Sequence, residues 1–195
     1  MRVSAVQSTD EFELGLLTQN DTPVACAESA LTAGLAVDSL VQIATLDDMR
    51  AAVNRIAAGA NRMMSLYTPD LEPELYDQSP FLDIAKRFVL ARNFVKIRVL
   101  VGDGRRLARD GNRFVAMGRR LGSYIEMRLM QTRIEQRAAS YLVADDRALL
   151  LRTRTGGWNG VADFNGTANA RLLLNEFDVV WQANTPQDEL QTASR

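Results

Sequence analysis

The chain has 195 residues, of which 47% are hydrophobic and 24% are charged, a composition typical of one soluble globular domain with a substantial core. It contains one cysteine and no histidine, which excludes an intrachain disulfide, a zinc site of the Cys/His kind and any mechanism that needs a histidine. No apolar run approaches the roughly 20 residues of a membrane span, and the first residues lack the apolar core of a signal peptide, so we expect a cytoplasmic protein.

The net charge of −1 conceals a segregation of charge along the chain. Residues 1–83 carry 13 acidic and 4 basic side chains, whereas residues 84–155 carry 6 acidic and 17 basic ones. Of the 23 basic residues, 21 are arginine, whose planar fork suits phosphate and carboxylate. Two interpretations follow: the basic segment binds an anionic partner, or the acidic and basic segments neutralise each other.

Three regions are expected. Residues 1–38 are acidic and then small and apolar, and they predict an N-terminal arm or an oligomer contact. Residues 39–186 form the predicted domain, and residues 187–195 form a polar tail.

The first predicted elements of the domain are a helix, a strand and a second helix. Thr45, followed by two acids, caps a helix that runs to about Arg62 with apolar residues at helical spacing. Met63–Tyr67 predicts a short strand, and a proline-containing loop follows it. Ser79-Pro80 is then expected to cap the second helix, and Asn93 to close it in a left-handed conformation.

A second strand is predicted at Val95–Val101, which is rich in β-branched residues. Gly102-Asp103-Gly104 follows it and is interpreted as a turn, because the third glycine of a dinucleotide-binding loop is missing. The next helix is interrupted by Gly111 and ends at Gly122.

In the last part of the domain, the sequence predicts three strands and a helix. The strands lie at Tyr124–Met130, Ser140–Ala144 and Ala148–Arg152, and the last two form a hairpin. Residues 153–165 predict a loop, and an amphipathic helix ending at Val180-Trp181 follows. The element order predicts an α/β fold with a mixed β-sheet flanked by helices.

Three blocks of sequence resemble the phospholipase D superfamily. The first is Met63–Tyr67 with the following loop and helix, and the others are A-R-N-F-V-K-I-R-V-L-V-G-D and A-A-S-Y-L-V-A-D-D-R-A-L-L-L. The runs Y-T-P-D-L-E-P-E-L-Y-D and L-L-N-E-F-D-V-V-W resemble a group of uncharacterised bacterial members, some of them fused to an N-acetyltransferase domain. The resemblance implies a phospholipase D-like half-domain. It also implies a homodimer, because active members pair two motifs from two repeats or two chains.

The catalytic motif of that superfamily is degenerate here. Ala138 stands at the position of the nucleophilic histidine and Ser140 at that of the lysine, while Asp145 matches the aspartate. The family's Gly-Ser-x-Asn segment has no clean counterpart, although Asn165 or Asn169 could substitute spatially. Asp145-Asp146 is interpreted as a hairpin turn in preference to a catalytic carboxylate pair. These departures favour a protein that is not an enzyme, with no cofactor and no metal.

The leading hypothesis is a catalytically inactive domain that binds an anion, either a phosphorylated ligand or a nucleic-acid backbone. One alternative is a protein-interaction or scaffold module that partners an N-acetyltransferase. Another is a phosphodiesterase with a rebuilt site that uses Ser140. Trp158 could stack on a ligand or cover a hydrophobic patch. The candidate ligand-binding residues are Arg98, Arg106, Arg109, Arg113, Arg128, Arg137 and Trp158.

Overall fold

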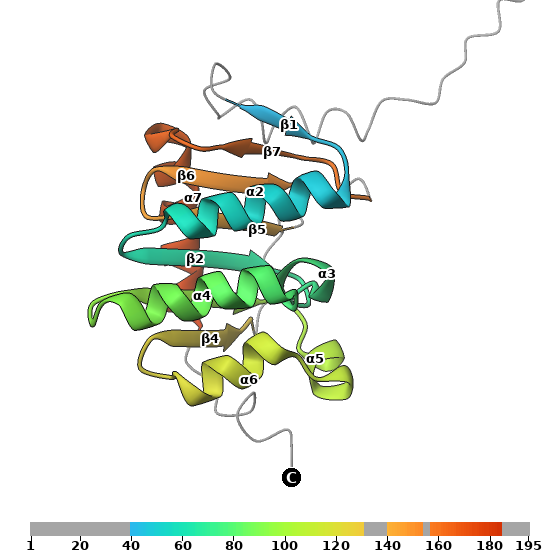
Figure 1. Ribbon diagram of the computed structural model, residues 1–195, viewed down its shortest axis with the longest axis vertical. Helices are drawn as coiled ribbons and strands as arrows, with labels where there is room; N and C mark the ends of the chain where they lie inside the picture. Colours follow the sequence, from blue (N-terminus) through green and yellow to red (C-terminus); the bar gives the residue numbers. More distant parts are fainter. Residues whose placement is uncertain (1–39, 131–139, 154–156, 185–195) are drawn as a thin grey trace, which may run out of the picture.

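A mixed β-sheet forms the centre of the computed structural model, which describes residues 40–130, 140–153 and 157–184 (Figure 1). Its seven strands lie in the order β1-β7-β6-β5-β2-β3-β4. The strands are β1 (Val41–Ile43), β2 (Met63–Thr68), β3 (Lys96–Val101), β4 (Ile125–Leu129), β5 (Ser140–Ala144), β6 (Ala148–Arg152) and β7 (Gly160–Asp163). The helices are α2 (Leu46–Gly59), α3 (Pro73–Tyr76), α4 (Ser79–Ala91), α5 (Arg105–Asp110), α6 (Arg113–Arg120) and α7 (Thr167–Ala183).

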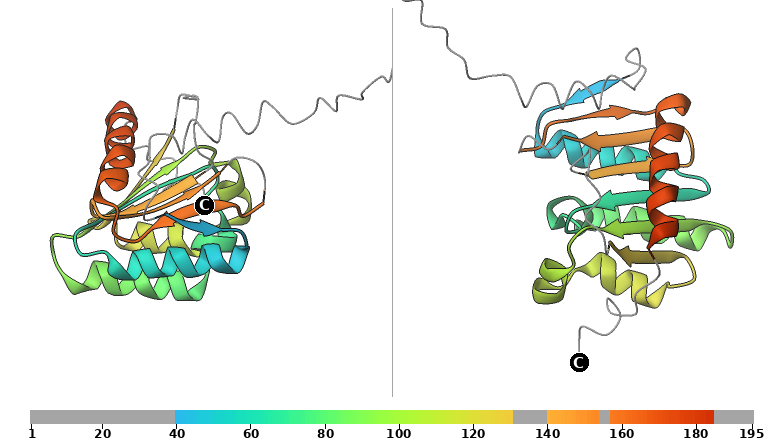
Figure 2. Two further views of the ribbon diagram at one scale, coloured as in Figure 1. Left: turned by 90° about the horizontal axis from the view of Figure 1, so that it is seen from above. Right: turned by 180° about the vertical axis from the view of Figure 1, so that it is seen from behind.

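The two halves of the sheet differ in strand direction. β2, β3 and β4 are parallel, while β5, β6, β7 and β1 continue from β2 as antiparallel neighbours. We call the end at which the parallel strands finish the carboxyl end of the sheet, and the opposite end the amino end. Helices α2, α4 and α6 cover one face, and α7 lies across the other (Figure 2). The predicted α/β fold with a mixed sheet between helices is confirmed.

Each face of the sheet has its own apolar core. On the α2 side, Met49, Val53 and Ile56 follow helical spacing and are buried against the sheet. This helix begins as predicted, because the Thr45 hydroxyl accepts the backbone N–H of Asp48 at 3.1 Å and satisfies one of the donors left free at a helix start. On the other side, Phe177 and Trp181 of α7 stack with ring centroids 5.5 Å apart. The two cores fix both helical layers to one rigid sheet.

Several local predictions were wrong. The predicted loop at residues 153–165 contains β7, whose four residues are all buried between β1 and β6. Strand β1 was not predicted at all. Helix α4 starts after Gln78 rather than at a Ser79 cap, and it ends with Arg92 in an extended conformation. Asn93 is not left-handed either; the described non-glycine residues in the left-handed region are Leu71 and Asp145.

The interruption expected at Gly111 is present. This glycine has φ of 72° and separates α5 from α6. Of the described residues, no helix is long and apolar enough to cross a membrane.

Candidate functional site

The degenerate motif maps to the carboxyl end of the sheet. Ser140 begins β5 and pairs with Arg152 at the end of β6, next to the carboxyl end of β2. Its side chain is buried. Ala138 and Arg137, the other predicted residues of this segment, lie outside the described residues.

A buried ion pair occupies this end. Glu72 is 4% exposed, and its Oε1 lies 2.6 Å from Nη2 of Arg152. The Thr68 hydroxyl donates to Glu72 Oε2 at 3.0 Å, and Arg152 Nε donates to Ser140 Oγ at 3.4 Å. We call these four residues the ion-pair cluster. It joins the ends of β2 and β6, the start of β5 and the loop after β2.

The loop after β2 turns Glu72 inward through a left-handed residue. Leu71 is completely buried and has φ of 61°, a conformation that is uncommon for a residue with a Cβ. Its backbone N–H donates to the Thr68 hydroxyl at 3.1 Å. Burial of the Leu71 side chain and this hydrogen bond together hold the turn that places the Glu72 carboxylate beside Arg152.

Burial controls the titration of the cluster. Desolvation raises the pKa of Glu72, against the lowering effect of Arg152 and of hydrogen bonds from Ser140 and Thr68. Burial also raises the pKa of the neighbouring Tyr76 hydroxyl well above its usual value, and the charge of Glu72 adds to this effect. The Ser140 hydroxyl is buried between the Glu72 carboxylate and the Arg152 guanidinium.

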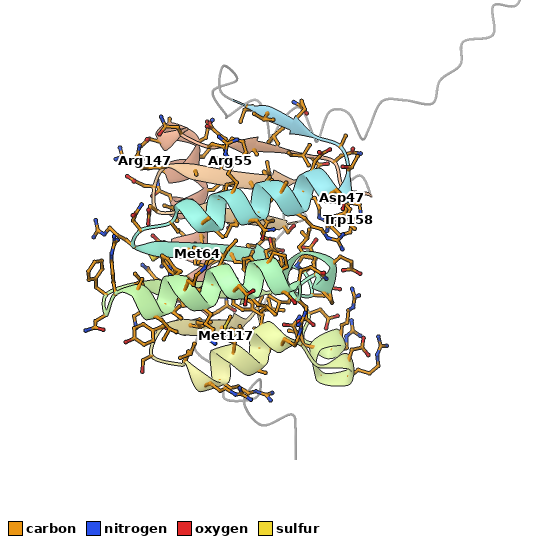
Figure 3. All side chains as sticks on the ribbon, in the orientation of Figure 1. Asp47, Arg55, Met64, Met117, Arg147 and Trp158 are labelled. Carbon is orange, nitrogen blue, oxygen red and sulfur yellow. The ribbon has the colours of Figure 1, made fainter. Side chains whose placement is uncertain are left out.

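Trp158 lies against this cluster from the loop before β7, at the same end of the molecule as the N-terminus of α2 (Figure 3). The Arg152 guanidinium lies 5.3 Å from the centroid of its ring, and Arg152 Nη1 also donates to the Gly157 carbonyl at 3.1 Å. The tryptophan packs against the apolar core as well. Whether Trp158 also stacks on a ligand stays a prediction.

Asp145 lies at the opposite, amino end of the sheet. Its carboxylate accepts the backbone N–H groups of Asn61, Arg62 and Met63 at 2.8–2.9 Å, and its φ is 54°. Asp146 forms an ion pair with Arg171 at 2.8 Å. The predicted hairpin turn is present, and Asp145 ties it to the chain that enters β2.

Arg98 and Arg128 lie beneath α7. Arg98 forms an ion pair with Asp178 at 2.7 Å and donates to the Ser65 hydroxyl at 3.0 Å. Arg128 donates to the carbonyls of Trp181 and Asn184 at 2.6 and 2.7 Å. The exposed fraction of both side chains is 16%. The two guanidinium groups thus hold the C-terminal part of α7 on the sheet.

The predicted arginines of α5 and α6 are paired with acids. Arg106 contacts Asp70 at 2.7 Å and Glu74 at 3.3 Å. Arg113 contacts Asp77 at 2.9 Å, and Arg109 contacts the adjacent Asp110 at 2.7 Å. The acidic and basic segments of the sequence therefore meet directly at the carboxyl end. The structure does not bring these arginines together with Arg98 and Arg128, which lie under α7.

A basic surface that the sequence reasoning missed lies at the amino end. Its side chains come from the C-terminal half of α4 and the residue that follows this helix, from the last turn of α6, from the segments that enter β2 and β3, and from the β5–β6 turn. All are exposed, and none forms an ion pair with another described residue. Figure 3 shows Arg147 at this end of the molecule. We call this surface the basic end; it consists of Arg62, Lys86, Arg87, Arg92, Lys96, Arg120 and Arg147.

The order of the parallel strands could have revealed this surface. Arg62, Lys96 and Arg120 each lie at or just before the start of a parallel strand or in the helix preceding it. Because the amino ends of parallel strands meet at one end of a sheet, these residues converge there.

A comparison with protein-family models assigns the chain to a family. The model of a domain of unknown function, DUF7931, matches residues 45–192. The chain belongs to this family. No curated protein sequence matches it.

Solved structures share the fold at low sequence identity. TrmBL2, an archaeal chromatin protein whose structure shows a novel mode of DNA binding, is 12% identical with a TM-score of 0.55 over 84% of this chain and 61% of that one. Nuc from Salmonella typhimurium, a phospholipase D family member, is 13% identical with a TM-score of 0.51. The match covers 71% of this chain and 90% of Nuc. NucT from Helicobacter pylori is 8% identical with a TM-score of 0.51, and the match covers 76% of this chain and 98% of NucT. The phospholipase D-like fold implied by the resemblance is thus confirmed, while the chain spans only 61% of TrmBL2.

Proposed function

We propose that this protein binds the phosphate backbone of a nucleic acid at the basic end and does not cleave it. The observation that carries the proposal is the set of seven exposed cations without ion-pair partners among the described residues. Such a surface attracts phosphates and gains affinity from the release of counterions.

The local electrostatic balance favours an anion at this end. Helices α2, α4 and α6 end here, and each C-terminus contributes about half a negative charge. The seven full positive charges exceed that sum several-fold. Two described carboxylates at the same end are already engaged, Asp145 by three backbone N–H groups and Asp146 by Arg171.

The carboxyl end is less suited to an anion. Its arginines already contact Asp70, Glu74, Asp77 and Asp110, so a phosphate there would have to displace carboxylates. Arg98 and Arg128 have little exposed surface to offer. For this reason the proposal places the ligand at the basic end, away from the residues expected from the sequence.

Two further observations support binding without cleavage. The sequence contains no histidine, and the Ser140 hydroxyl is buried and bonded to Arg152. The DNA binding of TrmBL2 shows that a protein of similar fold can engage a nucleic acid, which supports the proposed class of ligand.

The test is a salt series of binding to labelled single- and double-stranded DNA. The variant Arg62→Gln/Arg120→Gln removes two cations of the basic end, and Arg105→Gln/Arg109→Gln removes two exposed arginines of α5 as the matched control. We expect log K to fall linearly with log salt for the wild type. The slope should be shallower by about two in the first variant, because each phosphate contact contributes about one, and unchanged in the control.

The opposite result would overturn the proposal. If the slope of log K against log salt became shallower only in the α5 variant, the phosphate contacts would lie at the carboxyl end. Absence of binding at low salt would also overturn it and would favour a protein-interaction module instead.

A further inference from the structure

A groove lies between the C-terminal parts of α2 and α4, on the face of the sheet that carries these helices. Its volume is about 310 Å³, at the lower end of the range of small ligand pockets. Its floor and walls are mostly apolar: Ala57, Ala58, Ala60, Ile84, Phe88, Ala91 and Val95. The alanines on both helices leave room for side chains that approach from solvent.

Two arginines border this apolar groove. Arg87 and Arg92 are both exposed, and neither forms an ion pair with a described residue. Among the described residues, Arg92 donates to the Asn61 carbonyl at 3.1 Å, and its guanidinium lies 6.0 Å from the centroid of the Phe94 ring. Two large apolar residues near this end are also unusually exposed, Leu90 at 62% and Phe94 at 65%. An apolar groove with a cationic rim fits a peptide that carries large apolar side chains flanked by carboxylates.

The chain contains such a peptide. Residues 10–17 have the sequence D-E-F-E-L-G-L-L, with three acids and four large apolar residues among eight positions. In contrast, residues 18–39 have no comparable run of acids beside large apolar residues. We propose that residues 10–17 of the same chain bind in this groove, with their carboxylates near Arg87 and Arg92.

The length of the intervening chain permits this contact. Residues 18–39 separate the segment from Leu40, which precedes β1. A random-coil chain of 22 residues has an average end-to-end distance of roughly 25 Å, about the length of the 14-residue helix α2. A tether of that reach gives the segment an effective concentration on the order of millimolar, so even a weak site would be occupied.

Disulfide trapping in the full chain tests the proposal, because Cys26 is the only cysteine and can be replaced by serine. In the Cys26→Ser background, Gly15→Cys is combined with Ala58→Cys in the groove. The matched control combines Gly15→Cys with Ala168→Cys, an exposed alanine of α7 on the opposite face of the sheet. We expect the intramolecular disulfide to form on the order of tenfold faster with Ala58→Cys than with Ala168→Cys.

Charge reversal distinguishes this groove from other sites. Arg87→Glu/Arg92→Glu should slow disulfide formation in the Gly15→Cys/Ala58→Cys variant on the order of tenfold, because two attractive exposed pairs become repulsive. Adding Asp10→Lys, Glu11→Lys and Glu13→Lys to that variant should restore the rate. Equal rates for the two cysteine pairs, a predominantly intermolecular disulfide, or a rate that ignores charge reversal would each overturn the proposal. The reaction contains no nucleic acid, so its outcome is independent of the function proposed above.

Discussion

Arg152 and Glu72 illustrate how a single pair fixes the carboxyl end of the molecule. The exposed fraction of the Glu72 side chain is 5% and that of Arg152 is 17%. Two charges placed in such a site lose most of their hydration, and each remains tolerable only because the other is present. Removal of only one member of the pair is therefore expected to lower the free energy of unfolding strongly.

Removal of Arg152 should produce a pH-dependent loss of stability. In Arg152→Met, the Glu72 carboxylate is left buried without a counter-ion, which costs about 3–5 kcal/mol at neutral pH. The pKa of Glu72 is already raised by burial, and loss of the guanidinium raises it further. The folded variant then binds the proton more tightly than the unfolded chain, so its stability recovers as pH falls through that raised pKa and is lost as pH rises through it.

Urea unfolding at pH 7 and pH 5 measures this effect, and the deficit of Arg152→Met relative to the wild type should be smaller at pH 5. The double variant Glu72→Leu/Arg152→Met serves as the control. It buries no charge, so it should recover much of the loss and show no such pH dependence. A deficit that is the same at both pH values would contradict the assignment of a buried, charged Glu72.

Two cations, Arg98 and Arg128, contact helix α7. Among the described helices, only α7 lies on its face of the sheet. Arg128 donates to carbonyls at the C-terminal end of α7 and lies 4.1 Å from the centroid of the Trp181 ring. A cation at this place satisfies free carbonyls, opposes the helix dipole and stacks on an aromatic ring.

We expect Arg128→Ala to lower the free energy of unfolding by about 2–3 kcal/mol, the sum of these contributions. Hydrogen exchange should increase first at the backbone amides of the last turn of α7. The exposed Arg120 provides the control, since Arg120→Ala should change stability by less than about 0.5 kcal/mol. A similar small change in both variants would show that α7 is held by its apolar residues alone.

The elements differ in how far the sequence could predict them. The hairpin Ser140–Ala144 and Ala148–Arg152 was predicted with the observed bounds, because its strands are apolar runs separated by a turn of strong turn formers. β7 was missed because it is only four residues long, begins with glycine and is buried on both faces, so it shows no alternation. The loop predicted after β2 contains the short helix α3, Pro73–Tyr76, which was missed. The positive φ of Leu71, which directs Glu72 inward, was also not predicted, since that conformation depends on tertiary packing.

The candidate site was harder to predict than the fold. Arg98 and Arg128 were expected to bind an anion near the degenerate motif, but which face of a strand meets a helix depends on the register and packing of the whole sheet. For the arginines of α5 and α6, the sequence also allowed the alternative that they neutralise the acidic segment. The structure shows such ion pairs with Asp70, Glu74 and Asp77. Whether the arginines named in advance bind a ligand stays a prediction.

At the scale of the whole molecule, the two ends of the sheet have opposite characters. The carboxyl end is closed by the ion-pair cluster and by arginines that contact acids. The amino end carries seven exposed cations, two of which also border the groove between α2 and α4. If residues 10–17 bind that groove, their carboxylates cover Arg87 and Arg92 and compete with phosphate. The acidic start of the sequence would then regulate the basic surface.

This competition rests on both proposals and can be measured directly. Asp10→Asn/Glu11→Gln/Glu13→Gln should bind DNA several-fold more tightly at low salt, with a salt slope steeper by up to about two, because Arg87 and Arg92 become available to phosphates. The matched control is Asp21→Asn/Glu28→Gln/Asp38→Asn, which changes the net charge equally and leaves residues 10–17 intact. An equal gain in both variants would indicate a general effect of net charge and would contradict specific competition. A gain in the first variant that disappears when Arg87→Gln/Arg92→Gln is added would place the competition at these two arginines.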